Sequence, residues 1–302
     1  MDDEGIGTAS PPGILFCPAD DERKLRRISE RRAPAVALDL EDAVAPGRRE
    51  HARRLLAELG PGIACSVRTY VRINAWGSPD VKLDIESLRG LPIAGVLVAK
   101  VESAEQIRAI DEAMGTGSDG FANPAILPMI ETARGLVDVT AIANAAPGRI
   151  ETLVLGTADL SADLGLTPSW DAVELAPYRA TVVAATRAAG LSGPIDGPEL
   201  NLDPATFSSS CERSRRAGFA GRVCLTPDQA QVASTAYTQL IAAEVDRLRN
   251  LVEAYEAARF DGLAVARVGD GFVDAPVYHH ARRALDQHFT YADHDTHTKG
   301  LY

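Results

Sequence analysis

The sequence repeats one pattern eight times: a short apolar or β-branched run, in most cases followed by a segment of helix-forming composition. The runs are Ile14–Pro18, Ala35–Leu40, Tyr70–Ile73, Ala94–Val98, Ile126–Ile130, Leu153–Leu155, Pro194–Ile195 and Arg222–Leu225. The clearest helical segments are Glu22–Arg32, Arg48–Leu59, Ala104–Met114 and Ala172–Ala189, and Gly or Pro lies near many of their ends. Strands that alternate with helices in this way indicate a parallel sheet covered by helices. Eight such units in 302 residues predict an α/β fold, a (β/α)8 TIM barrel.

An open, doubly wound sheet is the alternative fold. No GxGxxG motif follows the first apolar run, and polar residues gather at many strand ends instead of at one crevice, so the barrel is favoured. We expect the barrel to span residues 13–234 and a C-terminal helical extension to span residues 235–290. Within the extension, Gly269–Tyr278 predicts a turn and a short strand before a helix, His279–His288. Residues 1–12 and 291–302 are expected to be disordered tails.

Composition excludes several classes of protein. The net charge of −11 and the pI near 5.1 argue against a nucleic-acid-binding surface. Two arginine pairs, Arg48–Arg49 and Arg53–Arg54, are interpreted as a solvated helix face, with a local anion site as the alternative. The four cysteines form no CxxC pair, and neither a secretory signal nor a membrane-spanning apolar run is visible. We expect free thiols and a cytoplasmic protein.

Charged or polar residues follow six consecutive runs, starting with the second. In a barrel, the C-terminal ends of all strands meet at one mouth, where the active site is built. These residues are Glu41 and Asp42, Arg72 and Asn74, Lys100 and Glu102, Glu131, Asp159, and Asp196.

Two of these acids, Glu131 and Asp159, close the fifth and sixth runs. Carboxylates held close together repel each other unless a proton or a cation lies between them, and Mg²⁺ prefers oxygen ligands with open water positions. The pair is therefore a candidate Mg²⁺ site, although Thr132 and Asp159 could instead cap the helices that follow. A second cluster, His294 and His297 among acids near the C-terminus, is interpreted as part of the disordered tail.

Five segments resemble motifs of the citrate lyase β-subunit-like (HpcH/HpaI aldolase) family, which includes malyl-CoA and citramalyl-CoA lyases. The similarity runs from about Gly13 to Leu285, and the five segments occur in the same order as in the family. The segments are LDLEDAVAP (38–46), VRIN (71–74), KVES (100–103), PMIETARG (128–135) and GTADLSADLG (156–165). The resemblance implies a TIM barrel that makes or breaks a carbon–carbon bond next to a thioester.

The resemblance also implies a role for individual residues. Glu131 and Asp159 would bind Mg²⁺, and Asp163, in the same motif, is placed on the helix side. Arg72 would hold the substrate oxygen on which enolate charge develops. Glu41 and Asp42 would orient Arg72, Lys100 or metal-bound water.

Asp274, in a Val-Asp-Ala-Pro segment, matches a position that supplies an acid/base carboxylate from a neighbouring subunit in lyases of this family. Members of the family are commonly trimers or hexamers, so the resemblance implies a homo-oligomer. The structural alternative for Asp274 is a helix N-cap, which Pro276 in the first turn would suit.

The expected function is a Mg²⁺-dependent lyase or aldolase that joins a 2-oxo acid to an acyl thioester, or cleaves the β-hydroxyacyl thioester product, with thioester hydrolysis as a related outcome. Two departures from the family leave two alternatives open: a carrier-protein thioester in place of the CoA ester, and a CoA-independent 2-oxo acid aldolase. The turn after the first strand reads Ala19-Asp20-Asp21-Glu22, whose acids would repel CoA phosphates, and Leu225-Thr226-Pro227 follows the eighth. A third departure, Ala99 before Lys100, is minor. A non-catalytic subunit of a larger complex is the remaining alternative.

Overall fold

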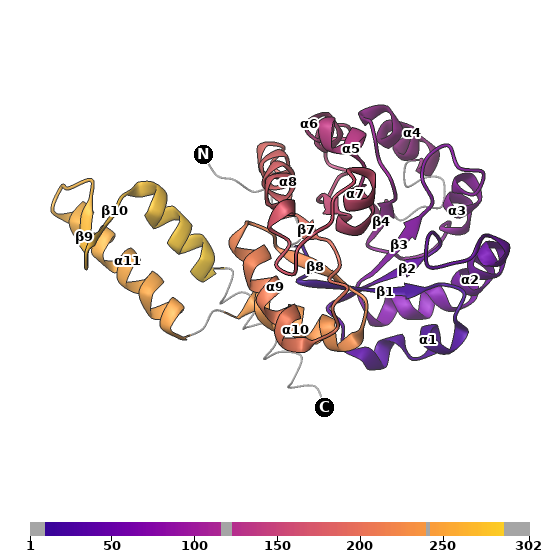
Figure 1. The fold of residues 1–302 in the computed structure, drawn as a ribbon, viewed down its shortest axis with the longest axis horizontal. Coiled ribbons are helices and arrows are strands. Elements are labelled where there is room, and N and C mark those ends of the chain that lie inside the picture. The colour runs from indigo at the N-terminus through magenta and orange to yellow at the C-terminus, as the bar shows by residue number, and fades with distance from the viewer. Residues whose placement is uncertain (1–9, 116–122, 240–241, 287–302) are drawn as a thin grey trace. The chain divides into compact units, whose positions relative to one another are not determined.

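The predicted barrel is confirmed. The computed structural model describes residues 10–115, 123–239 and 242–286. Eight parallel strands, β1 to β8, pair in chain order, and β1 also pairs with β8, so the sheet closes on itself (Figure 1). The chain divides into two compact units, residues 1–234 and 235–302, and the barrel lies in the first. The fold is therefore a (β/α)8 TIM barrel with a C-terminal appendage.

Each strand differs from its predicted range by at most one residue at either end. The strands are β1 Gly13–Pro18, β2 Ala35–Asp39, β3 Thr69–Ile73, β4 Gly95–Val98, β5 Ala125–Ile130, β6 Val154–Leu155, β7 Ile195–Asp196 and β8 Gly221–Cys224. The agreement arises because strands buried on both faces are continuously apolar.

Helices surround the barrel. They are α1 Glu22–Arg26, α2 Arg49–Ser66, α3 Val81–Ser87, α4 Ala104–Met114, α5 Ala133–Val137, α6 Val139–Ala143, α7 Thr157–Asp163, α8 Ala176–Ala188, α9 Pro204–Arg216 and α10 Pro227–Thr238, with 3₁₀ turns at Ile28–Arg31, Pro46–Arg48 and Val173–Leu175. The prediction that the second helix ends near Leu59 is wrong, because α2 continues through Pro61 to Ser66. Ile63 is buried in this last part of α2, so tertiary packing overrides the local Gly-Pro signal.

Alternation along the strands decides what lies inside the barrel. Side chains two residues apart on a strand point to the same face. The buried apolar cluster includes Ala37 of β2, Tyr70 of β3 and Met129 of β5. The next positions in the same series are Asp39, Arg72 and Glu131, so the inward-facing series changes from apolar to charged at the C-terminal end of the strands.

The opposite end of the barrel is closed by polar contacts. The Tyr70 hydroxyl bonds to Glu151, which also pairs with Arg68 at 3.0 Å. Ser10 is buried, and its hydroxyl donates to the Gly193 carbonyl at 2.7 Å. Residues 10–12 therefore pack with the barrel, contrary to their predicted place in a disordered tail; residues 1–9 lie outside the described residues.

The second unit contains helix α11 Ala242–Phe260, an antiparallel pair of strands, β9 Ala266–Val268 and β10 Gly271–Val273, and a helix over residues 275–286. Its two apolar clusters include Leu248 with Ala281, and Tyr255 with Val273. The predicted helix start at His279 is wrong, because the helix begins directly after Asp274. The predicted tail at 291–302, with His294 and His297, lies outside the described residues. Within the described part of the chain, every helix is too short or too polar to cross a membrane.

Candidate active site at the barrel mouth

Asp39 and Arg72 form a buried ion pair at the C-terminal ends of β2 and β3. The two residues lie opposite each other in the strand register. Asp39 accepts from Nε of Arg72 at 2.7 Å and from Nη2 at 2.5 Å, so the guanidinium is held by two parallel hydrogen bonds. Asp39 is 0% exposed and Arg72 is 7% exposed. A planar fork held in this way has a fixed orientation.

Arg72 remains a cation in this environment. Burial disfavours the charge, but hydrogen bonds to Asp39 and the nearby charges of Glu41 and Glu131 raise the pKa of Arg72 above its ordinary value. The guanidinium also lies 5.1 Å from the centre of the Phe16 ring, a distance suited to a cation–π contact.

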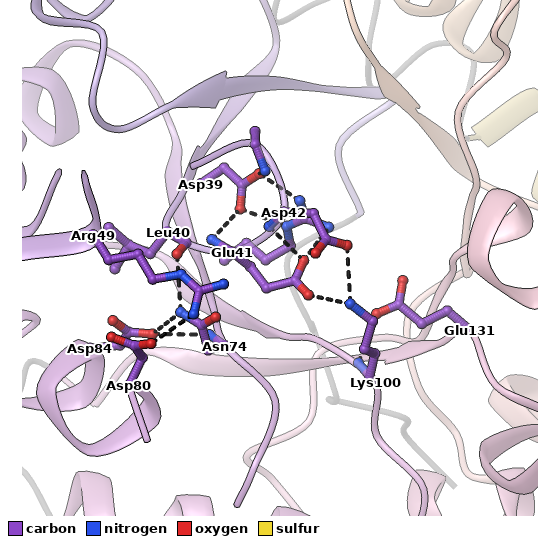
Figure 2. A network of polar contacts seen from close by, with 12 residues as sticks. Asp39, Leu40, Glu41, Asp42, Arg49, Asn74, Asp80, Asp84, Lys100 and Glu131 are labelled. Carbon is purple, nitrogen blue, oxygen red and sulfur yellow. Dashed lines mark hydrogen bonds and ion pairs between the residues drawn. The ribbon is translucent and has the colours of Figure 1, made fainter. Parts of the chain in front are cut away.

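Glu41 connects Arg72 to Lys100. Oε2 of Glu41 lies 3.1 Å from Nη1 of Arg72, and the other oxygen, Oε1, accepts from the Lys100 ammonium. Asp42 also binds this ammonium, at 3.0 Å, and its own main-chain N–H donates to Glu41 (Figure 2). Four of the predicted site residues thus form one network: Glu41, Asp42, Arg72 and Lys100.

The network shifts the pKa values of its members in opposite directions. Burial raises the pKa of Glu41, although the charge of Arg72 and the hydrogen bond from Lys100 oppose this shift. Burial would also raise the pKa of Asp42, but side-chain hydrogen bonds with Lys100 and Glu41 lower it. Burial disfavours the Lys100 ammonium, but hydrogen bonds to Glu41 and Asp42 raise the Lys100 pKa. Lys100 is therefore charged and tied to the β2–α2 loop.

Glu131 follows β5 and lies next to the network. It is 1% exposed, and its Oε1 accepts from the Lys100 main-chain N–H at 2.7 Å; Figure 2 shows Lys100 between Glu131 and the pair Glu41–Asp42. Burial raises the pKa of Glu131 to about 7, and the charges of Asp159 and Glu41 add to the effect, while the Lys100 N–H and Arg72 oppose it. A buried carboxyl that titrates near neutrality is typical of a functional site.

Asp159 lies within electrostatic reach of Glu131, but its predicted placement at the end of a strand is wrong. The sixth strand ends at Leu155, and Asp159 lies half-buried in the first turn of α7. Asp163 lies at the last residue of the same helix and accepts from the main-chain N–H of Ala133 at 2.6 Å. Asp163 therefore holds the start of α5, whereas Asp159 is the acid on the Glu131 side. Thr132 caps α5, which follows β5, through its hydroxyl and the N–H of Gly135, as the alternative predicted, whereas the N-cap residue of α7 is Gly156 and not Asp159.

The donors at this position fit a hard cation. Mg²⁺ usually keeps several waters and is held by one or two carboxylates plus substrate oxygens. Glu131 and Asp159 supply such a pair, whereas no three His, Cys, Asp or Glu side chains among the described residues are grouped as a closed metal cage. The residues present therefore fit Mg²⁺ better than Zn²⁺, which requires three or four protein ligands.

Asp39 is the residue of this site that sequence reasoning missed. It lies inside an apolar run and was therefore counted as a strand residue. Its position two residues before Glu41, the spacing of one strand face, was a signal in the sequence. Its place opposite Arg72 became visible with the strand register. Two other polar residues at strand ends have different partners. Asn74 donates to Asp84 of α3 at 2.7 Å, and Asp196 pairs with Arg179 of α8 at 3.1 Å.

The predicted solvated face of arginines is wrong for two of its members. The side chains of Arg49 and Arg53 are 18% and 13% exposed and pair with Asp80 at 2.7 and 3.1 Å. Asp80 is the N-cap residue of α3, 31 and 27 positions further along the chain, so the pairing was not visible in the sequence. The charges are neutralised within the fold, which also removes the alternative of a local anion site at Arg49 and Arg53.

The acidic turn after β1 is also paired. Asp20 binds Arg48 at 2.5 Å, Asp21 caps α1 and contacts Lys24 at 3.3 Å, and Glu22 pairs with Arg26 at 2.7 Å. Each acid thus has a cation beside it. This arrangement weakens the argument that the turn repels phosphates.

Asp274 lies in the second unit, directly before the helix of residues 275–286. It is exposed, and its Oδ1 accepts from the main-chain N–H of Val277 at 3.1 Å, which is an N-cap hydrogen bond. The structure therefore shows the capping contact of Asp274. Its role as the acid/base carboxylate of a neighbouring subunit's site stays a prediction.

Comparisons with known proteins show which family the chain resembles. Residues 13–227 match the HpcH/HpaI aldolase/citrate lyase family. A citrate lyase subunit beta-like protein of Mycobacterium tuberculosis strain H37Rv is 33% identical over 285 residues, which are 92% of this chain and 95% of that protein. A (3S)-malyl-CoA thioesterase of Cereibacter sphaeroides is 28% identical over 263 residues, covering 86% and 88% of the two chains.

Among solved structures, CitE from Mycobacterium tuberculosis in complex with magnesium, acetoacetate and coenzyme A superposes with a TM-score of 0.78 at 29% identity, covering 94% of this chain and 99% of CitE. The family match covers all eight strands of the barrel, and it includes every predicted site residue except Asp274. This chain belongs to the HpcH/HpaI aldolase/citrate lyase family.

Proposed function

We propose that this protein is a Mg²⁺-dependent carbon–carbon lyase that cleaves a β-hydroxyacyl thioester, of the malyl-CoA or citramalyl-CoA type, into a 2-oxo acid and an acyl thioester, or forms it from them. The observation that carries the proposal is the fixed cation of Arg72 beside the buried acid Glu131, at the barrel mouth. A carbon–carbon cleavage next to a thioester needs both a place for developing negative charge and an anchor for the oxo acid.

In the cleavage direction, a base takes the proton from the β-hydroxyl group, and the bond between the α- and β-carbons breaks. The hydroxyl carbon becomes the carbonyl of the 2-oxo acid, and the electron pair of the broken bond becomes the enolate of the thioester. Arg72 stabilises the enolate oxygen, because Asp39 holds the guanidinium in one orientation before the charge develops. A proton delivered to the α-carbon then gives the acyl thioester.

Glu131 and Asp159 would hold Mg²⁺ in this site. When bound, the ion polarises the carbonyl of the 2-oxo acid and stabilises the alkoxide formed on it. The magnesium in the complex of the CitE relative supports this assignment. Lys100 and Glu41 keep the mouth rigid by joining the loops after β2 and β4.

The acid/base carboxylate of the proposed reaction is Asp274 from a neighbouring subunit, in a homo-oligomer that we propose to be a trimer or hexamer. Two features of the second unit support this assignment. Asp274 is exposed, and one hydrogen bond from Val277 to Oδ1 fixes the carboxylate at the start of a helix.

A direct test combines metal binding with product analysis. Purified protein is incubated with Mg²⁺ and candidate β-hydroxyacyl-CoA esters, and with matching free hydroxy acids, while the 2-oxo acid and free CoA are measured separately. The proposal expects a 2-oxo acid and an acyl-CoA in equal amounts, and loss of both in the Glu131→Gln and Asp159→Asn variants together with loss of Mg²⁺ binding in calorimetry. Variants that bind Mg²⁺ as tightly as the parent would refute the ligand assignment.

Thioester hydrolysis is the second candidate, because the (3S)-malyl-CoA thioesterase of Cereibacter sphaeroides aligns over 86% of this chain. Release of free CoA with an intact hydroxy acid identifies this reaction. Carbon–carbon cleavage of free acids only identifies a CoA-independent aldolase, which the paired acids of the β1–α1 turn make less favourable. Absence of turnover with Mg²⁺ bound would favour a non-catalytic subunit.

A further inference from the structure

Lys100 has an unusual backbone for its residue type. It follows β4 with φ of +51°, in the left-handed region that residues with a Cβ rarely occupy. Among the described residues other than glycine, three more have positive φ, and none of them contacts the barrel-mouth network: Arg32, Asn123 and Ala172. Such a conformation persists where the surrounding contacts maintain it.

This backbone directs the two ends of Lys100 to different partners. Its main-chain N–H points to Oε1 of Glu131 at 2.7 Å, whereas its side-chain ammonium binds Glu41 and Asp42. Figure 2 shows Lys100 between the two groups of acids. One residue therefore touches the proposed metal ligand through its main chain and the β2–α2 loop through its side chain.

Gly156 bounds the other side of the Glu131 carboxylate. A Cβ added at Gly156 would lie 2.3 Å from Oε2 and 2.4 Å from Cβ of Glu131, so any side chain there would displace the acid. Gly156 directly precedes α7, which carries Asp159 in its first turn. Oε1 of Glu131 is thus the oxygen on the β4 side, and Oε2 is the oxygen on the side of α7.

We propose that the Lys100 main chain and Gly156 are positioning groups that make Glu131 a one-oxygen ligand, with Oε2 directed to the Mg²⁺ shared with Asp159. The inference rests on the proposed function. The amide N–H occupies one lone pair of Oε1 and fixes the rotation of the carboxylate, and the bare Cα of Gly156 lets Oε2 approach α7. The left-handed backbone of Lys100 is the feature that brings the amide to this position.

Two matched variants separate the backbone of Lys100 from its side chain. Lys100→Gly and Lys100→Val both remove the ammonium, but glycine accepts a positive φ and a β-branched residue does not. In calorimetry with MgCl₂, Lys100→Gly is expected to bind Mg²⁺ at least as tightly as the parent, since a nearby cation is lost, and Lys100→Val about tenfold more weakly. Equal affinities in the two variants would overturn the role of the Lys100 main chain.

Gly156→Ala tests the second positioning group, with Gly62→Ala on α2 as its control, because a Cβ at Gly62 meets nothing within 4 Å. Gly156→Ala is expected to bind Mg²⁺ at least tenfold more weakly, and Gly62→Ala as the parent does. Parent-like affinity in a folded Gly156→Ala variant would overturn the assignment of Oε2.

Amide hydrogen exchange in the metal-free protein tests the inference even if some of these variants fail to fold. The Lys100 amide proton is expected to exchange slowly with solvent in the parent and rapidly in Glu131→Ala, and fast exchange in the parent would overturn the inference. The same experiments distinguish it from the proposed function. If the parent and the Lys100 and Gly156 variants bind Mg²⁺ alike, only this inference is overturned. If the affinities separate as expected without carbon–carbon cleavage by the parent, only the proposed function falls.

Discussion

Arg72 shows how the site depends on the shape of one side chain. Asp39 binds two nitrogens along one edge of its guanidinium, which a lysine ammonium cannot reproduce. We predict that Arg72→Lys folds normally and loses turnover by about 10²- to 10³-fold, the range seen when one donor to a developing oxyanion is removed. Steady-state kinetics and thermal melting check this. Arg89→Lys, at an exposed pair with Glu86, is the control. Equal turnover in Arg72→Lys and the parent would contradict the role.

The titration of Glu131 gives a second prediction at this scale. Its pKa in the folded protein is about 7, above the ordinary value of 4.5, so between these pH values the folded chain binds a proton that the unfolded chain has released. In metal-free protein, the free energy of unfolding therefore falls as pH rises across this window, and Mg²⁺ affinity rises because the ion competes with the proton.

Chemical unfolding at about pH 5 and about pH 8 measures the first effect, and the parent is expected to lose roughly a few kcal/mol relative to Glu131→Gln. Calorimetry at the same pH values measures the second, with roughly tenfold weaker Mg²⁺ binding per pH unit below the pKa. If the parent and Glu131→Gln show the same pH dependence of stability, the buried carboxyl does not titrate in this window.

At the scale of elements, one buried acid joins a strand and two helices. Asp84 of α3 is fully buried and binds Asn74 after β3 and Arg53 of α2, the latter at 2.8 Å. We predict that Asp84→Ala lowers the free energy of unfolding by about 3 kcal/mol or more, because Arg53 and Asn74 lose a buried partner. Asp80→Ala, at a partly exposed position, is expected to cost about 1 kcal/mol. Denaturant unfolding checks both, and equal losses would contradict the argument.

The sequence predicted these elements best where burial produces a continuous run of apolar residues. Continuous apolar runs located all eight strands, because both faces of each strand are covered. The end of α2 was missed because the local Gly and Pro residues predict a helix end, whereas Ile63 is buried and the helix continues to Ser66. Asp159 was placed at the end of the sixth strand, but this strand ends at Leu155 and α7 begins at Thr157, so Asp159 lies in the first turn of a helix.

Which residues of the site pair with each other could not be predicted from the sequence. The residue types at the strand ends indicated a charged mouth, but pairing requires knowledge of register. Asp39 and Arg72 are 33 positions apart and meet because their strands align at these two residues. In the same way, the position of Lys100 beside Glu131 depends on a backbone angle that a lysine in a sequence does not reveal.

At the scale of the whole molecule, the proposed role of Asp274 predicts complementation between inactive subunits. Asp274→Asn keeps a side chain that can cap the helix, so the fold is preserved while the acid is lost. Mixed with Glu131→Gln under conditions of proven subunit exchange, it is expected to regain partial activity, since some sites then combine an intact barrel with an intact Asp274. No recovery would place Asp274 outside a neighbouring subunit's site.

The pairing of β1 with β8 also has a consequence for how the chain is made. Strand β1 is complete at Pro18, yet one of its edges acquires its partner only when synthesis has passed Cys224. Until then the growing sheet has two open edges, each of which can pair with a strand of another chain. The ribosome-bound intermediate is therefore the form of this protein most exposed to misassembly, and slow translation before β8 prolongs that exposure.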